Sequence, residues 1–326
     1  MKHLLLFDTS EGSDNLGDGI IMDYCEMQLK EILNDFYFIY KVPTHLEIGP
    51  QGYKLNKKSD YSIVCGTNIL KTCIITNKGW RLYLKDILNL KNLCLMGAGW
   101  GNYNSFKSDP YTRWAYKKIL SRTLIHSVRD EYTKKRLEEI GIKNVLNTAC
   151  PTMWNLTPEF CKSIPTSKSE NVVTALTDYL PNPEKDKIML EILHNNYNRI
   201  FFWTQQDKDI EYLQSLNLKF DINILNPTLK DYDNFLSNNN VDYIGSRLHG
   251  GIRALNHKIR SLIIGVDNRA TEINKDTNLP FIHRDNIENL SIWINGNMAT
   301  IINLPIDNIN KWKSQFIHKN NESILY

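Results

Sequence analysis

The stretch from residue 241 to residue 267, VDYIGSRLHGGIRALNHKIRSLIIGVD, constrains the fold of this chain more than any other part of it. It begins with an apolar run, residues 241–244, which gives way at Gly245 to a short polar turn. Two glycines then open a segment with the spacing of a helix. This order is typical of a buried strand, a loop and a helix start in an α/β protein. We therefore expect the turn to lie at the carboxyl end of a strand, where α/β proteins bind ligands.

The residues of this turn suit a small anionic ligand. Arg247 carries a planar guanidinium that pairs with carboxylate or phosphate, and His249 can give or take a proton near neutral pH. Gly250 and Gly251 allow a ligand close to the backbone, and a helix start offers unpaired amides to an anion. An ion-paired arginine and a histidine at a helix cap are the structural alternative for each residue alone. Their combination at a strand end favours a site.

The first half of the chain also has polar or glycine-bearing loops after apolar runs. The loop after the first expected strand, EGSDNLGDG, contains an N-x-G-D element, in which Asp18 could equally be a plain helix cap. Runs at 61–65 and 93–97 each lead into a further loop. The second of these, GAGWG, lacks the third glycine of a dinucleotide fingerprint, since that position is Asn102. We expect a substrate-binding rim made of Asn15, Gly17, Asp18, Thr67, Asn68, Gly97, Gly99 and Trp100.

Three signatures of the chain resemble the polysaccharide pyruvyl transferase family. They are the N-x-G-D element, the segment SVRD at residues 127–130 with the helix and strand that follow it, and SRLHGGIRAL at residues 246–255. The chain departs from the family at Cys150-Pro151, where members commonly have Asp-Pro. A nucleophilic role for Cys150 has no activating neighbour in the sequence, so a buried thiol is the expectation.

The resemblance implies both a fold and a reaction. The fold is α/β, with two Rossmann-like domains of the glycosyltransferase-B kind facing each other across a cleft. The reaction is the transfer of pyruvate from phosphoenolpyruvate, a co-substrate, to a sugar as a cyclic ketal, without a cofactor. In this interpretation His249 is the general acid or base, with Arg247 beside it, and Arg129 and Arg247 hold the donor from opposite domains. Gly250, Gly251, Arg269 and Glu272 are further donor-binding candidates.

Strand and helix signals alternate in both halves of the chain, and its 326 residues suit two domains. The composition turns polar and proline-bearing between residues 154 and 170, which we interpret as a linker. We therefore expect an N-terminal domain at 1–160 and a donor-binding domain at 170–304. A C-terminal helix at 305–326, with an apolar stripe of Ile309, Trp312 and Phe316, is expected to pack back near the domain junction.

Composition excludes several other functions. The net charge of +3, from 39 basic and 36 acidic residues, does not favour nucleic acid as a partner. The six cysteines follow no metal spacing, and no carboxylate or histidine cluster suggests a metal site. The cysteine pattern indicates reduced thiols in a cytoplasmic protein. Because no apolar stretch has the length of a membrane span, any membrane contact is expected to be peripheral, at the inner face. A sugar, an oligosaccharide or a lipid-linked glycan of a capsule or exopolysaccharide is the expected acceptor.

Two alternative functions stay open. A nucleotide-sugar-dependent glycosyltransferase of the same architecture would use Arg247 to neutralise a departing diphosphate and His249 on the sugar or acceptor. A glycan-binding relative would retain the fold without catalysis, although the presence of Arg129, Arg247 and His249 speaks against it. The polar residues Thr204, Gln205 and Gln206, which follow the apolar run at 199–203, could line the cleft in either case.

Overall fold

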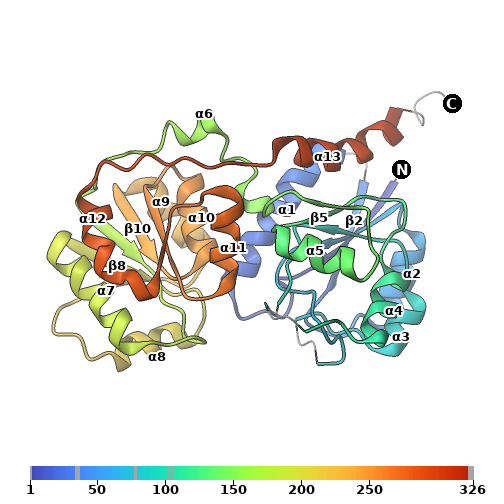
Figure 1. The fold of residues 1–326 in the computed structure, drawn as a ribbon, viewed down its shortest axis with the longest axis horizontal. Coiled ribbons are helices and arrows are strands. Elements are labelled where there is room, and N and C mark those ends of the chain that lie inside the picture. Colours follow the sequence, from blue (N-terminus) through green and yellow to red (C-terminus); the bar gives the residue numbers. More distant parts are fainter. Residues whose placement is uncertain (1, 34–36, 77–78, 102, 104–105, 322–326) are drawn as a thin grey trace. The chain divides into compact units, whose positions relative to one another are not determined.

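The computed structural model describes residues 2–33, 37–76, 79–101, 103 and 106–321, and it divides into two compact units (Figure 1). Unit 1 comprises residues 1–13, 21–154 and 305–326, and unit 2 comprises residues 14–20 and 155–304. The grouping of residues 14–20 with unit 2 differs from the expected boundaries, in which they were part of the N-terminal domain. The polar segment after Trp154 does coincide with the change from unit 1 to unit 2.

Unit 1 is built on parallel strands. Its four-stranded sheet has the order β2-β1-β3-β4, and a two-stranded parallel ladder, β5-β6, follows it along the chain. The inner strands β1, β3 and β4 are mostly apolar and buried, as expected for a parallel sheet covered on both faces. The interior of β1, for example, is buried throughout Leu4 to Phe7. The strand bounds are β1 (Lys2–Asp8), β2 (Tyr37–Pro43), β3 (Tyr61–Cys65), β4 (Leu93–Met96), β5 (His126–Val128) and β6 (Val145–Asn147).

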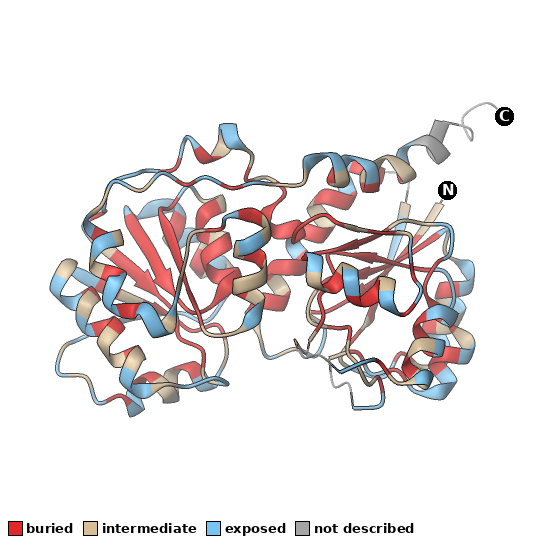
Figure 2. Ribbon diagram, in the orientation of Figure 1, coloured by how far each residue is buried: buried red, intermediate tan, exposed pale blue. Residues whose placement is uncertain are grey.

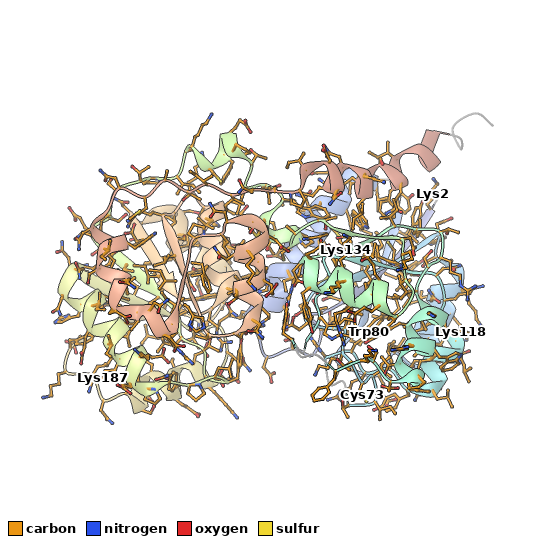
Figure 3. All side chains as sticks on the ribbon, in the orientation of Figure 1. Lys2, Cys73, Trp80, Lys118, Lys134 and Lys187 are labelled. Carbon is orange, nitrogen blue, oxygen red and sulfur yellow. The ribbon has the colours of Figure 1, made fainter. Side chains whose placement is uncertain are left out.

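Helices cover both faces of the unit 1 sheet, and their buried sides contribute to its core (Figure 2). Trp80 lies inside this core, whereas Lys118 points outward from α4 (Figure 3). The helices are α1 (Leu16–Leu33), α2 (Gly49–Lys58), α3 (Leu84–Asn89), α4 (Pro110–Ile119), α5 (Glu131–Glu139) and α13 (Ile306–Asn321), with a 3-10 turn at Pro151–Met153. None of the helices in the part of the chain that the structure describes is long and apolar enough to span a membrane.

The C-terminal helix α13 packs within unit 1. Its stripe of Ile309, Trp312 and Phe316 is buried, with exposed fractions of 4%, 0% and 0%. Phe316 meets Tyr61 of β3 edge to face at 5.1 Å, and Trp312 meets Trp154 at 5.6 Å. An amphipathic helix placed last in the sequence therefore completes the core of the first unit.

Helix α4 begins with a side-chain cap that should depend on pH. The carboxylate of Asp109 accepts hydrogen bonds from the backbone N–H of Thr112 at 2.8 Å and from its hydroxyl at 2.6 Å. Burial alone would raise the pKa of Asp109, but these hydrogen bonds lower it below its ordinary value. A depressed folded-state pKa adds stability above the unfolded pKa, near 4, and this stability is lost as the pH falls through the folded value.

We expect Asp109→Ala to cost about 1 kcal/mol of unfolding free energy at pH 7, the usual contribution of an N-cap, and clearly less at pH 3. Chemical denaturation at the two pH values measures this difference. Asp109→Asn is the matched control, because asparagine also caps helices but does not titrate. An equal loss for Asp109→Ala at both pH values would contradict the ionised cap.

Unit 2 contains one six-stranded parallel sheet with the order β12-β11-β10-β7-β8-β9. Counted from β7, this is the order 3-2-1-4-5-6 of a doubly wound nucleotide-binding fold, which reverses direction between β7 and β10. In such sheets ligands bind outside the carboxyl ends of the strands at this switch point. The strands are β7 (Asn171–Thr174), β8 (Arg199–Trp203), β9 (Asn223–Leu225), β10 (Val241–Gly245), β11 (Ser261–Gly265) and β12 (Phe281–His283).

Helices also cover both faces of the unit 2 sheet. The helices α7, α8 and α12 share a buried cluster on one face, which includes Phe202 and Ile244. On the other face Trp203 of β8 stacks on Tyr232 of α9, with ring centroids 3.9 Å apart. The helices are α6 (Pro158–Cys161), α7 (Pro183–Asn196), α8 (Lys208–Ser215), α9 (Leu229–Asn238), α10 (Leu248–Asn256), α11 (Asn268–Thr277) and α12 (Leu290–Asn295), with a 3-10 segment at Arg284–Asn289.

Candidate functional site

The loops that follow β7 and β10 meet at the switch point of unit 2. The backbone N–H of Ser246 donates to the carbonyl of Ala175 at 2.9 Å. The hydroxyl of Thr177 donates to the carbonyl of Ser246 at 3.2 Å. The turn identified in the sequence thus lies at the carboxyl end of β10, and hydrogen bonds connect it to the loop after β7.

Arg247 lies at this point, and carboxylates surround its guanidinium. It is 2% exposed and forms a two-point ion pair with Asp209, in which the Nε–Oδ2 distance is 3.1 Å. Its Nη2 also donates to Asp178 at 2.9 Å, and its Nε donates to the carbonyl of Leu176 at 2.9 Å. Burial raises the pKa of Asp209, while Arg247 acts against that shift. With two carboxylates around one guanidinium, the cluster does not present a net positive charge to a ligand.

His249 lies in the first turn of α10, immediately after Arg247. The helix begins at Leu248. Arg247 occupies the N-cap position, and its side chain does not accept a hydrogen bond from the first backbone N–H groups. His249 is 6% exposed and therefore sits in a largely water-excluded position. A helix N-terminus attracts negative charge, so an anionic group near His249 would be stabilised there.

The glycines after His249 also have a packing role. A Cβ on Gly251 would lie 2.2 Å from Cδ1 of Ile263 and 2.6 Å from Cε1 of Tyr243. A Cβ on Gly250 would lie 3.2 Å from the Trp203 ring. These positions face the sheet, so the two glycines let α10 approach β10 and β11 closely.

The N-x-G-D element is part of unit 2 and binds Gln205 of the same unit. The side-chain oxygen of Asn15 accepts from the N–H of Gly17 at 2.9 Å and from Nε2 of Gln205 at 2.8 Å. The N–H of Leu16 donates to the carbonyl of Gln205 at 3.0 Å. The element was expected on the N-terminal rim, whereas residues 14–20 group with unit 2. Asp18 is inside α1 rather than before it, and Asn15 occupies the cap position.

Gln205, which the sequence suggested as a cleft-lining residue, is a buried partner of the N-x-G-D element. It is 3% exposed, although polar residues at strand ends are usually solvated. Because Asn15 accepts from its Nε2, the amide orientation is set, and its Oε1 faces Gly250 in the first turn of α10. This Oε1 has no hydrogen-bond partner among the residues that the structure describes. The only available signal was the polar sequence TQQ directly after the apolar run of β8.

In unit 1, Arg129 contacts residues of the loops after β3, β4 and β5. It is 1% exposed, and its Nη2 donates to the Asn68 side chain and, at 3.2 Å, to the Tyr103 hydroxyl. Its Nε lies 3.3 Å from Asp130. Burial works against the charged form, yet Tyr103 and Asp130 hold the pKa of Arg129 above its ordinary value. A Cβ on Gly99 would lie 2.3 Å from Cζ of Arg129, so this position requires a glycine.

Three other residues of the expected rim have structural roles. Trp100 is fully buried, and its indole N–H donates to Thr72 at 3.3 Å, which corrects its assignment as a substrate-binding residue. Gly97 has a φ of +66°, and a Cβ there would lie 2.1 Å from Cδ of Pro151. Thr67 contributes its backbone carbonyl to the N–H of Gly99 at 2.8 Å.

Arg269 and Glu272 lie on α11, and each already forms an ion pair with an oppositely charged side chain. Arg269 binds Asp267 through its Nε at 2.7 Å and also donates to the hydroxyl of Tyr179. Glu272 pairs with Lys275 at 2.6 Å. The ring of Tyr179 lies 5.3 Å from Cζ of Arg247 and 5.5 Å from Cζ of Arg269. Tyr179, which the sequence analysis did not identify, therefore connects the two arginines.

Cys150, which replaces the family's aspartate, is a buried thiol. It is 1% exposed, and burial raises its pKa above the ordinary value. The hydroxyl of Thr152 donates to its sulfur at 3.1 Å. This hydrogen bond by itself lowers the pKa of Cys150, but burial outweighs it, so a thiolate nucleophile is disfavoured. Among the described residues, no group of three or more His, Cys, Asp or Glu side chains could hold a metal ion.

Comparison with solved structures shows the same fold in sugar-nucleotide enzymes. The UDP-GlcNAc 2-epimerase from Methanocaldococcus jannaschii has a TM-score of 0.58 and 13% identity, and the match covers 99% of this chain and 100% of that one. The UDP-GlcNAc 2-epimerase from Neisseria meningitidis bound to UDP-GlcNAc has a TM-score of 0.52 and 14% identity, covering 98% and 100%. The expected fold class is confirmed as α/β with two parallel sheets, similar to glycosyltransferase-B proteins. No curated protein matches the chain.

The family model described as "Polysaccharide pyruvyl transferase" matches residues 15–268. This range begins at Asn15, which binds Gln205, and ends at Asn268, the first residue of α11. It includes the three signatures named above and both loops of the unit 2 switch point. The chain therefore belongs to the polysaccharide pyruvyl transferase family, a family of transferases.

Proposed function

We propose that this protein transfers pyruvate from phosphoenolpyruvate to a sugar of a cell-surface polysaccharide or its precursor, as a ketal. The observation that carries the proposal is the position of His249. It lies in the first turn of α10, at the switch point of a doubly wound sheet and within the matched family region. Such a position places a proton-transfer group beside an anion-attracting helix terminus.

The reaction needs one proton-transfer group and a stabilised anion. His249 donates a proton to the methylene carbon of phosphoenolpyruvate, and C2 becomes an oxocarbenium-like centre. A sugar hydroxyl forms a bond to C2 and releases its proton, and the C2–O bond to phosphate then breaks. A second hydroxyl attacks C2, loses its proton and closes the ketal. Phosphate is the leaving group, and no oxidant or reductant is required.

The anion-binding roles follow from the contacts of each arginine. The amides at the start of α10 are the proposed first anion contact. Direct binding by Arg247 requires the donor to replace Asp178, the more exposed of its carboxylates at 12%. Otherwise Arg247 positions the loop that bears His249. Arg129, with Asn68 and Gly99 around it, is proposed as a second anion-binding residue.

The remaining assignments are part of the same proposal. Arg269 and Glu272 are donor-side residues at the start of α11, and Asn15, Gly17 and Asp18 are substrate-binding residues, of which Asn15 binds Gln205. The acceptor is a sugar, an oligosaccharide or a lipid-linked glycan for a capsule or exopolysaccharide, and the reaction takes place in the cytoplasm.

The second candidate is glycosyl transfer from a nucleotide sugar. It is favoured by the similarity to epimerases, one of which is bound to UDP-GlcNAc. A base and a ribose supply contacts that do not depend on Arg129, whereas phosphoenolpyruvate concentrates its charge at two ends. An arginine fork binds such groups bidentately and a lysine does not.

Calorimetry with phosphoenolpyruvate and with UDP-GlcNAc separates the two functions. We expect wild type to bind phosphoenolpyruvate and Arg129→Lys to weaken this binding at least about tenfold, the loss of one good charged hydrogen bond. Arg122→Lys, at an exposed position in the same unit, is the control and should bind as wild type does. Binding of UDP-GlcNAc that survives Arg129→Lys, with no heat from phosphoenolpyruvate, would establish glycosyl transfer instead.

A further inference from the structure

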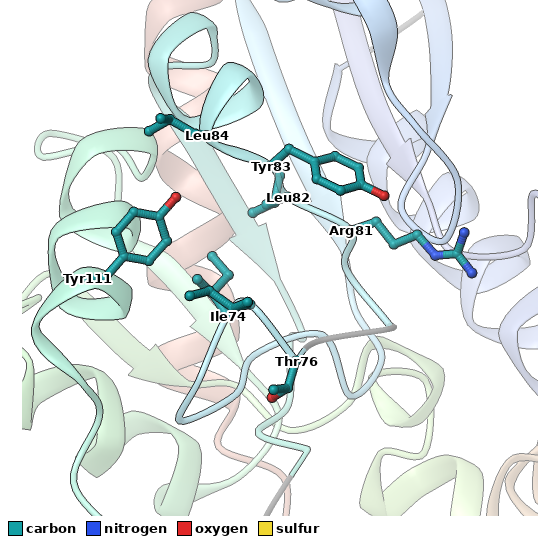
Figure 4. Close-up of a pocket in the computed structure, with 8 residues that line it drawn as sticks. Ile74, Thr76, Arg81, Leu82, Tyr83, Leu84 and Tyr111 are labelled. Carbon is teal, nitrogen blue, oxygen red and sulfur yellow. The ribbon is translucent and has the colours of Figure 1, made fainter.

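Unit 1 contains an apolar pocket that the proposed chemistry does not use (Figure 4). It has a volume of about 520 Å³. Aliphatic and aromatic side chains form most of its wall, and Arg81, the one cation among the described lining residues, lies at one end. The lining includes Ile74, Ile75, Leu82, Tyr83, Leu84 and Tyr111.

The pocket lies toward the carboxyl edge of the unit 1 sheet. The N–H of Arg81 donates to the carbonyl of Thr44 at 3.1 Å, and the N–H of Thr44 donates to the carbonyl of Asp8 at 3.0 Å. Thr44 directly follows β2, and Asp8 is the last residue of β1. Because parallel strands end at one edge, Arg81 and the loop bearing Asn68 lie on the same edge of this sheet.

The side chains at the mouth are apolar yet exposed to water. Ile75 is 75% exposed and Leu84 is 53% exposed, while Tyr83 is 47% exposed. Isolated exposed apolar residues are common, but several around one concave site indicate a ligand or a partner. The guanidinium of Arg81 is exposed and has no carboxylate partner in the described part of the chain. In its described lining, the pocket thus combines a hydrocarbon surface with the positive charge of Arg81.

We infer that this pocket binds the hydrocarbon chain of a lipid phosphate, with the phosphate paired to Arg81. Branched aliphatic walls and two tyrosines match an isoprenoid or acyl chain, and a guanidinium at the end matches the phosphate. A free sugar would leave Ile74, Ile75 and Leu84 against polar hydroxyls, so the lining disfavours it. In the proposed function, this makes the acceptor a glycan carried on a lipid phosphate. Only the identity of the attached glycan depends on the proposed function. The binding of a lipid phosphate in this pocket does not depend on it.

Farnesyl phosphate, kept below its micelle concentration, is the probe, and its binding to the full-length protein is measured by calorimetry. We expect saturable binding to wild type and at least a tenfold weaker affinity for Leu84→Asp, which places a carboxylate at the apolar wall. Arg81→Gln should weaken the binding of farnesyl phosphate but leave the affinity for farnesol unchanged. Leu88→Asp is the matched control, because Leu88 is 57% exposed on the same helix and does not line the pocket. It should bind as wild type does.

The results can overturn the inference in distinct ways. Equal weakening by Leu84→Asp and Leu88→Asp would show a general effect of charge on α3. Inorganic phosphate that competes as well as farnesyl phosphate would show an anion site without a lipid. Binding to phosphatidylglycerol vesicles with no affinity for monomeric farnesyl phosphate would show a membrane surface contact. Failure to bind phosphoenolpyruvate would refute the proposed function and leave this result unaffected.

Discussion

Replacing His249 with alanine is expected to lower the rate of pyruvyl transfer by about 10²- to 10⁴-fold, the range for loss of a positioned general acid or base. The histidine is 6% exposed at the N-terminal turn of α10, where α/β folds of this strand order bind ligands. The loss should appear in kcat, because the donor's charge is held by other groups. Phosphate release from phosphoenolpyruvate in the presence of an acceptor measures the rate.

Two comparisons separate catalysis from folding in that experiment. His249→Gln retains much of the side-chain volume and hydrogen-bonding capacity but cannot transfer a proton in the same way, so it should be as inactive as His249→Ala. His257→Ala changes a partly exposed histidine at the other end of α10, which pairs with Asp233 at 3.3 Å, and should retain activity. If His249→Gln keeps more than about a tenth of the activity, His249 is not the proton donor.

Replacing Asp209 with alanine is expected to destabilise unit 2 by about 3–5 kcal/mol, the usual cost of removing one partner of a buried ion pair. Asp209 is fully buried, and its loss would leave Arg247 with Asp178 as its remaining carboxylate partner. The Asp209 carboxylate also accepts from the N–H groups of Gln205 at 3.1 Å and Gln206 at 3.0 Å. One substitution therefore disturbs both the arginine and the loop after β8.

Urea denaturation of wild type and of two alanine variants tests this expectation. Asp221→Ala is the control, because Asp221 is exposed in the same unit and should change stability by less than about 0.5 kcal/mol. A similarly small effect of Asp209→Ala would mean that the ion pair does not hold Arg247. Asp178 and the carbonyl of Leu176 would then be the groups that hold its guanidinium.

Much of the fold could be predicted from local patterns. The apolar runs at 61–65, 93–97, 199–203 and 241–244 contain the strands β3, β4, β8 and β10, although β4 ends at Met96. Asp130 caps α5 through the N–H of Thr133 at 2.7 Å. These features are local, because they depend on hydrophobic period and on capping chemistry within a few residues. The family resemblance is confirmed for the same reason, since its signatures are short segments around strand ends.

The site itself was less predictable, because neighbours distant in sequence decide what each side chain does. The same GAGWG loop contains Gly99, which touches Arg129, and Trp100, which is buried in the core. Nothing in the local spacing distinguishes a residue that faces a ligand from one that faces the sheet. Gly251 is such a case, since the reason for a glycine is the ring of Tyr243 and the side chain of Ile263.

The sequence by itself determined the α/β class, the strand that ends at Gly245 and the presence of Arg247 and His249 in one turn. These features depend on the spacing of apolar residues and on which residues are neighbours along the chain, and both can be read from the sequence. Tertiary structure alone decided the charge around that turn. Asp209 and Asp178, 38 and 69 residues away, come together on Arg247, and Asn15 reaches Gln205 across 190 residues. Electrostatic and hydrogen-bond energies depend on distances between atoms, and the fold sets those distances.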